Sequence, residues 1–251
     1  MRLRVLGCYG RLTPSHRSTG FLLNDDALLD AGTVNSALDV SAMERLQVLF
    51  LSHAHVDHVK ELPFLLMERA NKRLPSLILA AIPGVIDAVR RHLLNGVLWP
   101  DFTMIGDPPA LVYHELPIAK AASVGGYEVT AVPVHHTVPC AGFYLRWDGE
   151  GFVYTGDTAT TDAIWHVVKR HDDIRTVLVE TTFADAGEAA ARITGHYCPK
   201  TLAADVAKAE RAPRLLITHM RPELCGAIAS DLAKAGLDAR LVEQDLEYDL
   251  G

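Results

Sequence analysis

The sequence is poor in cysteine and has no excess of basic residues, and both absences restrict what the protein can be. Its four cysteines, Cys8, Cys140, Cys198 and Cys225, form no C-x-x-C pair, which argues against a disulfide framework and against a thiolate zinc site. The formal net charge of -7 argues against a surface that grips nucleic acid, because binding to a phosphate backbone requires a basic footprint. It leaves room for a small anionic substrate that is held by metal ions.

Long hydrophobic runs are also missing. No apolar stretch approaches the roughly 18 residues that a membrane span needs, and the N-terminal stretch 1–7 is too short for a signal peptide. We therefore expect a cytoplasmic protein that does not enter a membrane. With 49% hydrophobic and 22% charged residues, and no repeat or break in composition, the 251 residues predict a single globular domain over 1–251.

The most informative stretch is Ser52-His53-Ala54-His55-Val56-Asp57-His58, where three histidines and one aspartate fall within six residues. It follows the apolar run 48–51, which is typical of a buried strand. The polar residues therefore lie on the loop that leaves the C-terminal end of a strand, where open α/β folds build their sites. The first two histidines can point to one side of the turn, and the aspartate and third histidine to the other, which suits two metal ions. Imidazole and carboxylate are ligands that zinc, manganese or iron accept, and packing alone has no use for four such groups.

Later strands also end in polar residues that could join this site. The predicted strands 126–134, 151–155, 176–179 and 215–218 are followed by His135-His136, Asp157, Glu180 and His219, respectively. Adjacent residues on a strand point to opposite faces, so at most one residue of the histidine pair should be a ligand. Histidines that are simply buried in the core, with their hydrogen bonds satisfied, do not explain why so many strands end in residues of this kind.

The stretch 53–58 resembles the H-x-H-x-D-H signature of the metallo-β-lactamase superfamily, and the resemblance extends from Leu29 to His219. It implies an α/β fold of the αββα four-layer sandwich type and two divalent metal ions, with zinc expected first and manganese or iron as alternatives. It favours His136 over His135, because a glycine and an aromatic residue follow His136 at the spacing of the family. The ligand set implied by the resemblance is His53, His55 and His136 for one ion, Asp57, His58 and His219 for the other, and Asp157 between them.

Other segments complete the predicted frame. The pattern predicts strands at 3–6, 20–23, 27–29 and 77–80, helices at 62–70, 83–94 and 201–210, and closing strands over 239–248. Asp30 is expected to brace the metal loop from behind, and Thr33 is a candidate helix N-cap. The Gly-rich and Ser-rich loop 7–19 reads as a surface loop that could also reach the site.

Two phosphodiesterase branches of the superfamily resemble the chain. Class II cyclic-nucleotide phosphodiesterases are similar in the leader 7–23, the turn 30–33, the Trp99-Pro100 segment and the stretch 195–199. Ribonuclease Z, the tRNA 3′-processing endonuclease, is similar in 62–66, 136–143 and 180–183, but it usually carries a basic arm that we do not find in this sequence. Core packing alone would also explain Trp99.

The resemblance therefore implies a phosphodiesterase that hydrolyses 3′,5′-cyclic nucleotides (cAMP or cGMP) to 5′-nucleotides by attack of a metal-bridging hydroxide. A ribonuclease Z-like endonuclease and a metal-dependent acyl hydrolase (a lactonase or thioesterase) are the alternatives. The expected partner is a small phosphodiester, and relatives make a homodimer a further expectation. The predicted catalytic residues are Asp57, also a metal ligand, and the pair Glu180 and His196, which would protonate the leaving oxygen.

Overall fold

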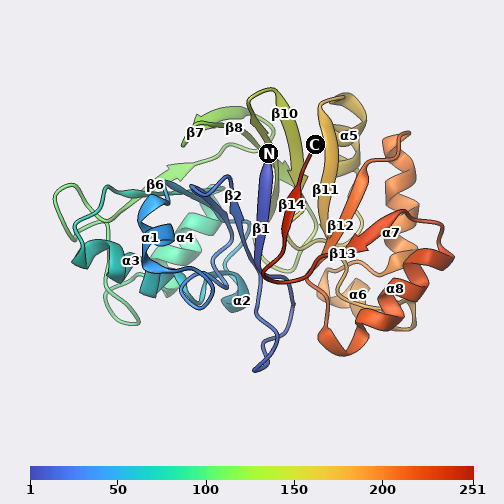
Figure 1. Cartoon of the computed structure of the whole chain (residues 1–251), viewed down its shortest axis with the longest axis horizontal. Coiled ribbons are helices and arrows are strands. Elements are labelled where there is room, and N and C mark those ends of the chain that lie inside the picture. Colours follow the sequence, from blue (N-terminus) through green and yellow to red (C-terminus); the bar gives the residue numbers. More distant parts are fainter.

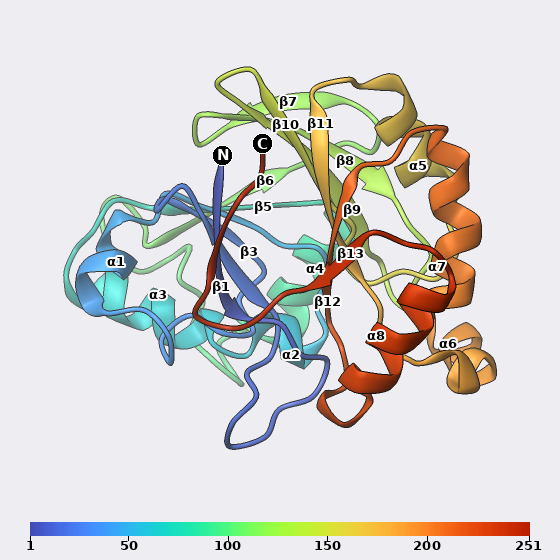
Figure 2. The same ribbon diagram turned by 45° about the vertical axis from the view of Figure 1, so that its right-hand side comes forward.

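In the computed structural model, which describes residues 1–251, two seven-stranded mixed sheets pack face to face and helices cover the outer face of each (Figure 1). Helices α1, α3 and α4 lie on one side, and α5 to α8 lie on the other (Figures 1 and 2). The two termini lie side by side, because the last strand pairs with the first. This arrangement is the four-layer αββα sandwich, and the predicted fold class is confirmed.

The first sheet contains the N-terminal half of the chain and the final strand. From edge to edge it consists of β14 (Glu247–Asp249), β1 (Arg2–Gly7), β2 (Gly20–Leu23), β3 (Ala27–Leu29), β4 (Val48–Phe50), β5 (Leu77–Ala81) and β6 (Leu111–Glu115). Strands β14 to β3 pair antiparallel, whereas β3 to β6 pair parallel.

The second sheet repeats this division into two halves. It consists of β13 (Ala239–Leu241), β12 (Arg214–Thr218), β11 (Ile174–Glu180), β10 (Glu150–Tyr154), β9 (Ala141–Trp147), β8 (Tyr127–Pro133) and β7 (Ala121–Val124). Strands β7 to β10 pair antiparallel, whereas β10 to β13 pair parallel. The C-terminal ends of a parallel half-sheet share one edge, and each sheet therefore offers such an edge for a site.

The helices are short and amphipathic. They are α1 (Val40–Arg45), α2 (Val56–Val59), α3 (Leu62–Asn71), α4 (Pro83–His92), α5 (Asp162–Arg170), α6 (Glu188–Thr194), α7 (Pro199–Val206) and α8 (Cys225–Lys234), with the 3₁₀ turns η1 (Asp185–Gly187), η2 (Ala207–Ala209) and η3 (Pro222–Leu224). Helices α4 and α7 begin with proline, which is suited to the first helical turn because its missing N–H would have no partner there.

Three apolar layers hold the sandwich together. The central layer lies between the sheets and joins aromatic residues such as Phe50 and Phe152. One outer layer packs α1, α3 and α4 on the first sheet, and the other packs α5, α7 and α8 on the second, with Trp165 fully buried in the latter. Burial of apolar surface in all three layers is the main stabilising contribution expected for such a fold.

The elements predicted from the sequence agree with these bounds to within about two residues, apart from the two places below. The sequence did not predict β6, β7, α1, α2, α5, α6 or α8. Thr33 is not a helix N-cap: its hydroxyl donates to the carbonyl of Ser18 at 2.6 Å, and α1 starts only after Asp39, whose carboxylate accepts from the amide of Ala42. The helix predicted over 201–210 starts at Pro199 and tightens into η2, because Glu210 turns into the left-handed region with φ of 51°. All four cysteines are free, and no helix has both the length and the hydropathy to cross a bilayer.

We predict that Phe152→Ala lowers the free energy of unfolding by about 3–5 kcal/mol, because truncating a buried aromatic leaves a cavity. Phe152 is fully buried between the two sheets. Urea unfolding followed by far-UV circular dichroism measures the loss. Phe64→Ala is the matched control, since Phe64 is 47% exposed on α3 and should lose clearly less. Equal losses would contradict the central layer as the main core.

Candidate metal centre

The predicted site residues converge where the parallel halves of the two sheets meet. Asp30 follows β3, and the histidine-rich stretch follows β4 and runs into α2, which lies below the centre of the view in Figure 2, above the blue β1–β2 loop. From the other sheet, Asp157 follows β10, Glu180 ends β11 and His219 follows β12. The strand-end rule used on the sequence therefore holds for both sheets at once.

The carboxylate of Asp157 lies at the centre of the cluster. Its Oδ2 is 3.2 Å from His219 Nε2, 3.4 Å from His58 Nε2, 3.6 Å from His53 Nε2 and 4.0 Å from His136 Nε2. Two sets of side chains extend from it. His53, His55, His136 and Asp157 form one set that could hold an ion, and Asp57, His58 and His219 form another. In each set the ligand-type atoms lie within 4.8 Å of one another.

Most of these imidazoles are held by an oxygen on the nitrogen that faces away from the cluster. His58 Nδ1 is 2.7 Å from Asp30 Oδ2, His136 Nδ1 is 3.0 Å from the Gly195 carbonyl, His53 Nδ1 is 3.0 Å from Ser52 Oγ, and His219 Nδ1 is 2.9 Å from Thr182 Oγ1. Metal-binding histidines usually donate their second N–H to such an oxygen, which fixes the ring and the tautomer. His55 is the exception, since its Nδ1 faces the cluster, 3.1 Å from His53 Nε2.

Asp30 anchors the metal loop from behind, as the sequence suggested. Its Oδ1 accepts from the amide of Ser52, and its Oδ2 accepts from Tyr154 Oη at 2.6 Å, across the two sheets. Its backbone has φ of 56°, a left-handed conformation that is uncommon for a residue with a side chain. Two residues on, a Cβ on Gly32 would lie 1.7 Å from the Asp57 carbonyl, so only glycine lets this turn approach α2.

Two observations show that the cluster suits cations. His58 Nε2 and Asp157 Oδ1 are buried and have no hydrogen-bond partner, although buried polar atoms nearly always have one. Burial alone would raise the pKa of Asp157, but the adjoining imidazoles of His219 and His58 hold that pKa well below its usual range. Carboxylate and imidazole donors around orphaned atoms match the ligand preferences of zinc and similar ions.

Glu180 and His196 form a pair beside the cluster. Glu180 Oε1 accepts from His196 Nδ1 at 2.9 Å, and the carboxylate is fully buried. Burial opposes the charged imidazole, but the carboxylate outweighs it and raises the pKa of His196 to about 9. The ring stacks on His219 at 5.3 Å and lines the same cavity of about 290 Å³ as the metal-type residues. A ligand-type nitrogen of His196 also lies within 4.8 Å of ligand-type atoms of Asp157 and His219.

Sequence reasoning missed one residue that joins these parts. Thr182 Oγ1 contacts Glu180 Oε2 at 3.0 Å and His219 Nδ1 at 2.9 Å. It therefore connects the Glu180–His196 pair to the metal cluster. The stretch 180–183 was noticed for its resemblance, but a hydroxyl two residues after a strand-end carboxylate has no pattern of its own. The sequence also does not single out Arg11 and Arg221, which line the same cavity, because isolated arginines form no motif.

Two residues considered in the sequence analysis, His135 and Trp99, lie outside the cluster. His135 points away from the cluster, and its Nδ1 donates to the carbonyl of Thr160 at 2.7 Å, so the structure brings His136 and not His135 to the site. Trp99 packs against Phe64 with ring centroids 5.2 Å apart, in the layer outside the first sheet. It is not among the residues that line the metal cavity.

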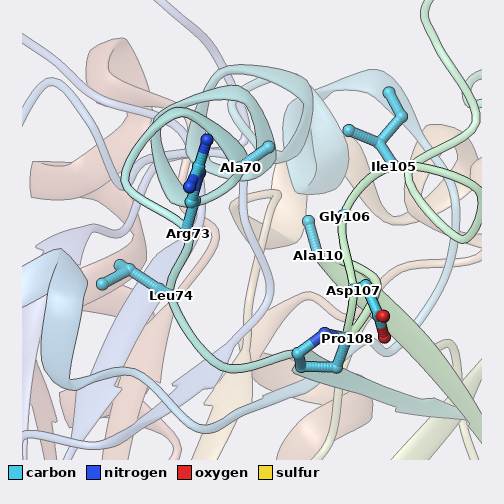
Figure 3. A pocket seen from close by; sticks show the side chains of 8 residues that line it. All are labelled: Ala70, Arg73, Leu74, Ile105, Gly106, Asp107, Pro108 and Ala110. Carbon is cyan, nitrogen blue, oxygen red and sulfur yellow. The ribbon is translucent and has the colours of Figure 1, made fainter.

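A separate hollow of about 350 Å³ lies between the end of α3 and the loop before β6 (Figure 3). Its charged residues are Arg73 and Asp107, which in Figure 3 extend in different directions and do not converge. It contains no histidine and no group of ligand-type residues. The metal cavity is therefore the candidate functional site.

Comparison with known proteins agrees with this geometry. Residues 26–220 match the family model described as the β-lactamase superfamily domain. A probable 3′,5′-cyclic-nucleotide phosphodiesterase of Yersinia pestis is 24% identical over 199 residues, which cover 69% of this chain and 56% of that protein. A ribonuclease Z of Haloarcula marismortui is 22% identical in an alignment 296 positions long, which covers 95% of this chain and 92% of that protein. The crystal structure of unliganded yeast PDE1 shares the fold, with a TM-score of 0.82, 14% identity and 98% of both chains covered.

We predict that the purified protein binds close to two transition-metal ions per chain, because two sets of ligand-type residues are present and Asp157 Oδ2 lies within 4.0 Å of imidazole nitrogens from both. His53→Ala should remove mainly one ion and His219→Ala mainly the other. His53 belongs to the first set of ligands described above, and His219 belongs to the second. Elemental analysis after reconstitution measures both losses. His135→Ala is the matched control and should retain full metal content, because that ring faces away. One ion or none in the unmodified protein would contradict the dinuclear centre.

Proposed function

The chain belongs to the metallo-β-lactamase superfamily of hydrolases, and we propose that it hydrolyses 3′,5′-cyclic nucleotides to 5′-nucleotides. The observation that carries the proposal is the position of Asp157, whose Oδ2 lies within 4.0 Å of imidazole nitrogens from both ligand sets. A carboxylate shared in this way supports a site for two ions, which suits displacement at phosphorus. The name of the Yersinia relative supports the substrate class.

The metal ligands of the proposed enzyme are the two sets described above. His53, His55 and His136 would hold one ion and Asp57, His58 and His219 the other. Asp157 would contact both ions, because its Oδ2 lies 3.4 Å from His58 Nε2 and 3.6 Å from His53 Nε2. Zinc is the expected metal, with manganese or iron as alternatives, because the donors are nitrogen and oxygen. Two such ions, when bound, supply a water of lowered pKa and positive charge for the phosphoryl oxygens.

The chain's own residues supply the proton that the leaving group needs. A ribose alkoxide is a poor leaving group and has to be protonated as it departs. His196 faces the cavity, and Glu180 holds its Nδ1, so its Nε2 is the nitrogen that can deliver a proton. Thr182 positions this pair relative to His219 through its hydroxyl, which contacts both Glu180 and His219. Asp57 acts from α2 as a metal ligand, 3.3 Å from His219 Nε2.

The surroundings of the cavity support a small substrate. The longest irregular segment, 93–110, contains no lysine or arginine and two aspartates, so it cannot serve as a basic arm. The cavity itself measures about 290 Å³, and its only arginines are Arg11 and Arg221. With a net charge of -7 on the chain, a long polyanion would meet repulsion on most of the surface.

A ribonuclease Z-like reaction is the second candidate. It is favoured by the length of the match to the Haloarcula protein, which covers 95% of this chain and 92% of that protein, whereas the match to the Yersinia protein covers only 56% of it. The same metal ligands and the same Glu180–His196 pair would serve either phosphodiester. The two candidates therefore differ in substrate size, not in chemistry.

We predict that the zinc-loaded or manganese-loaded enzyme converts cyclic AMP or cyclic GMP to the 5′-monophosphate. The assay offers cyclic AMP, cyclic GMP, bis-p-nitrophenyl phosphate, a precursor tRNA and a lactone, and it identifies the products by chromatography. His53→Ala serves as the control for metal-dependent turnover. If the enzyme cleaved the precursor tRNA but not the cyclic nucleotides, a ribonuclease Z-like function would replace the proposal. If it cleaved only the lactone, an acyl hydrolase function would replace it.

We predict that His196→Ala lowers kcat for a cyclic nucleotide by about 10²- to 10⁴-fold, the usual contribution of a general acid. The loss should be much smaller for bis-p-nitrophenyl phosphate, because p-nitrophenolate hardly needs a proton to leave. Metal content should stay intact, and elemental analysis checks this alongside the kinetics. An equal loss on both substrates, or loss of metal together with activity, would make His196 a binding residue or a metal ligand.

A further inference from the structure

The loop between β1 and β2, blue at the lower edge of Figures 1 and 2, is fastened to the segment that carries His219. The amide of Gly10 donates to the carbonyl of Met220 at 3.1 Å. A Cβ on Gly10 would lie 2.7 Å from Cε1 of His219, so the residue at this position has to be glycine for the loop to lie against the ring. The next residue, Arg11, is thereby placed at the mouth of the metal cavity.

A second arginine, Arg221, lines the same cavity. Arg221 follows His219 by two residues, and its guanidinium lies over the ring of Phe183, 5.6 Å from the centroid. The Phe183 ring in turn lies 6.0 Å from the ring of His196. One aromatic ring, that of Phe183, therefore connects the Arg221 guanidinium with the proposed proton donor His196.

The two arginines share a single carboxylate. Glu223 Oε1 accepts from Arg11 Nη1 at 3.0 Å and from Arg221 Nη2 at 2.8 Å, and neither arginine makes another ion pair. One positive charge at the mouth is thus left without a partner. Each guanidinium has five N–H donors, and most of them have no acceptor here. The side chains are 58% and 37% exposed, so a ligand in the cavity can reach them.

We infer that Arg11 and Arg221 form a binding site for a second phosphate group of the substrate, one that is not cleaved. Guanidinium groups bind phosphate through paired, charge-assisted hydrogen bonds, which explains why two arginines flank the entrance to a phosphodiester site. The preferred substrate is then a nucleotide with a further phosphate near the scissile one, such as a cyclic nucleotide phosphorylated on its ribose. The inference rests on the proposed function in taking the metal centre as the site of the scissile phosphate.

A purely structural role explains the arrangement less well. The loop is already fastened by backbone hydrogen bonds to Met220 and by Gln244, whose side chain contacts Arg17 and Ser15. Exposed ion pairs add little to stability. A single arginine would neutralise Glu223, and the second would have no function.

Isothermal titration calorimetry on the metal-loaded protein tests the inference with two ligands that differ by one phosphate, adenosine 5′-monophosphate and adenosine 3′,5′-bisphosphate. We expect the bisphosphate to bind about 10- to 100-fold more tightly, as charge-assisted hydrogen bonds imply. Arg11→Ala and Arg221→Ala should each reduce this preference and leave the monophosphate Kd nearly unchanged. Arg221→Lys should keep part of the preference, because it keeps the charge.

Two further variants separate ligand binding from loop packing. Glu223→Gln should increase the preference for the bisphosphate, because it removes the carboxylate that competes for the two arginines. If the arginines only held the loop in place, Glu223→Gln would reduce the preference, as the arginine variants do. Arg91→Ala on α4, where Arg91 is exposed and paired with Asp87, is the matched control and should change nothing. The inference is overturned if the unmodified protein shows no preference, if the preference survives both arginine substitutions, or if both ligands lose affinity together. Because the readout is binding, failure of the phosphodiesterase assay would be recognised separately.

Discussion

A carboxylate buried among imidazoles is the constraint on which this structure depends. Asp157 is only 2% exposed, and a buried charge persists only where opposite charge or hydrogen bonds surround it. Its Oδ2 faces imidazoles from both ligand sets, and its Oδ1 has no partner. Two cations would satisfy both oxygens. The need for positive charge at this one point explains why strands from both sheets end around it.

The two sheets are joined at the site by more than apolar packing. Tyr154, at the end of β10, donates to Asp30, at the end of β3, and the amide of Ala141 donates to the carbonyl of Ser52. Asp30 and His219 both adopt positive φ values, of 56° and 57°, which non-glycine residues keep only where the surroundings fix them. The meeting of the two sheets therefore fixes the positions of the candidate ligands.

The parts of the site that could be predicted from the sequence are those that repeat a rule. A strand followed by a polar residue located Asp157, Glu180 and His219, and alternation along a strand limited the histidine pair to one member. The N-cap prediction for Thr33 was wrong, because an N-cap hydroxyl has to bond to a helix amide. The Thr33 hydroxyl instead donates to the carbonyl of Ser18. Thr182 and the two arginines at the cavity mouth could not be predicted, since their roles exist only after β11, β12 and the β1–β2 loop are brought together. Tertiary proximity leaves no periodic trace in the sequence.

The distribution of charge gives the proposed site a way to select substrates by size. At physiological ionic strength fields are screened over about 8 Å, so a small anion inside the cavity meets mainly the charges that line it. The charged side chains among them are Asp57, Asp157 and the two arginines that share Glu223, with His196 beside them, and bound metal ions would add positive charge. A polyanion would extend beyond this radius and meet a surface with 31 acidic against 24 basic residues in the chain. An acidic surface of this kind would repel a long nucleic acid but would have little effect on a nucleotide inside the cavity, which the two arginines and bound metal ions would attract.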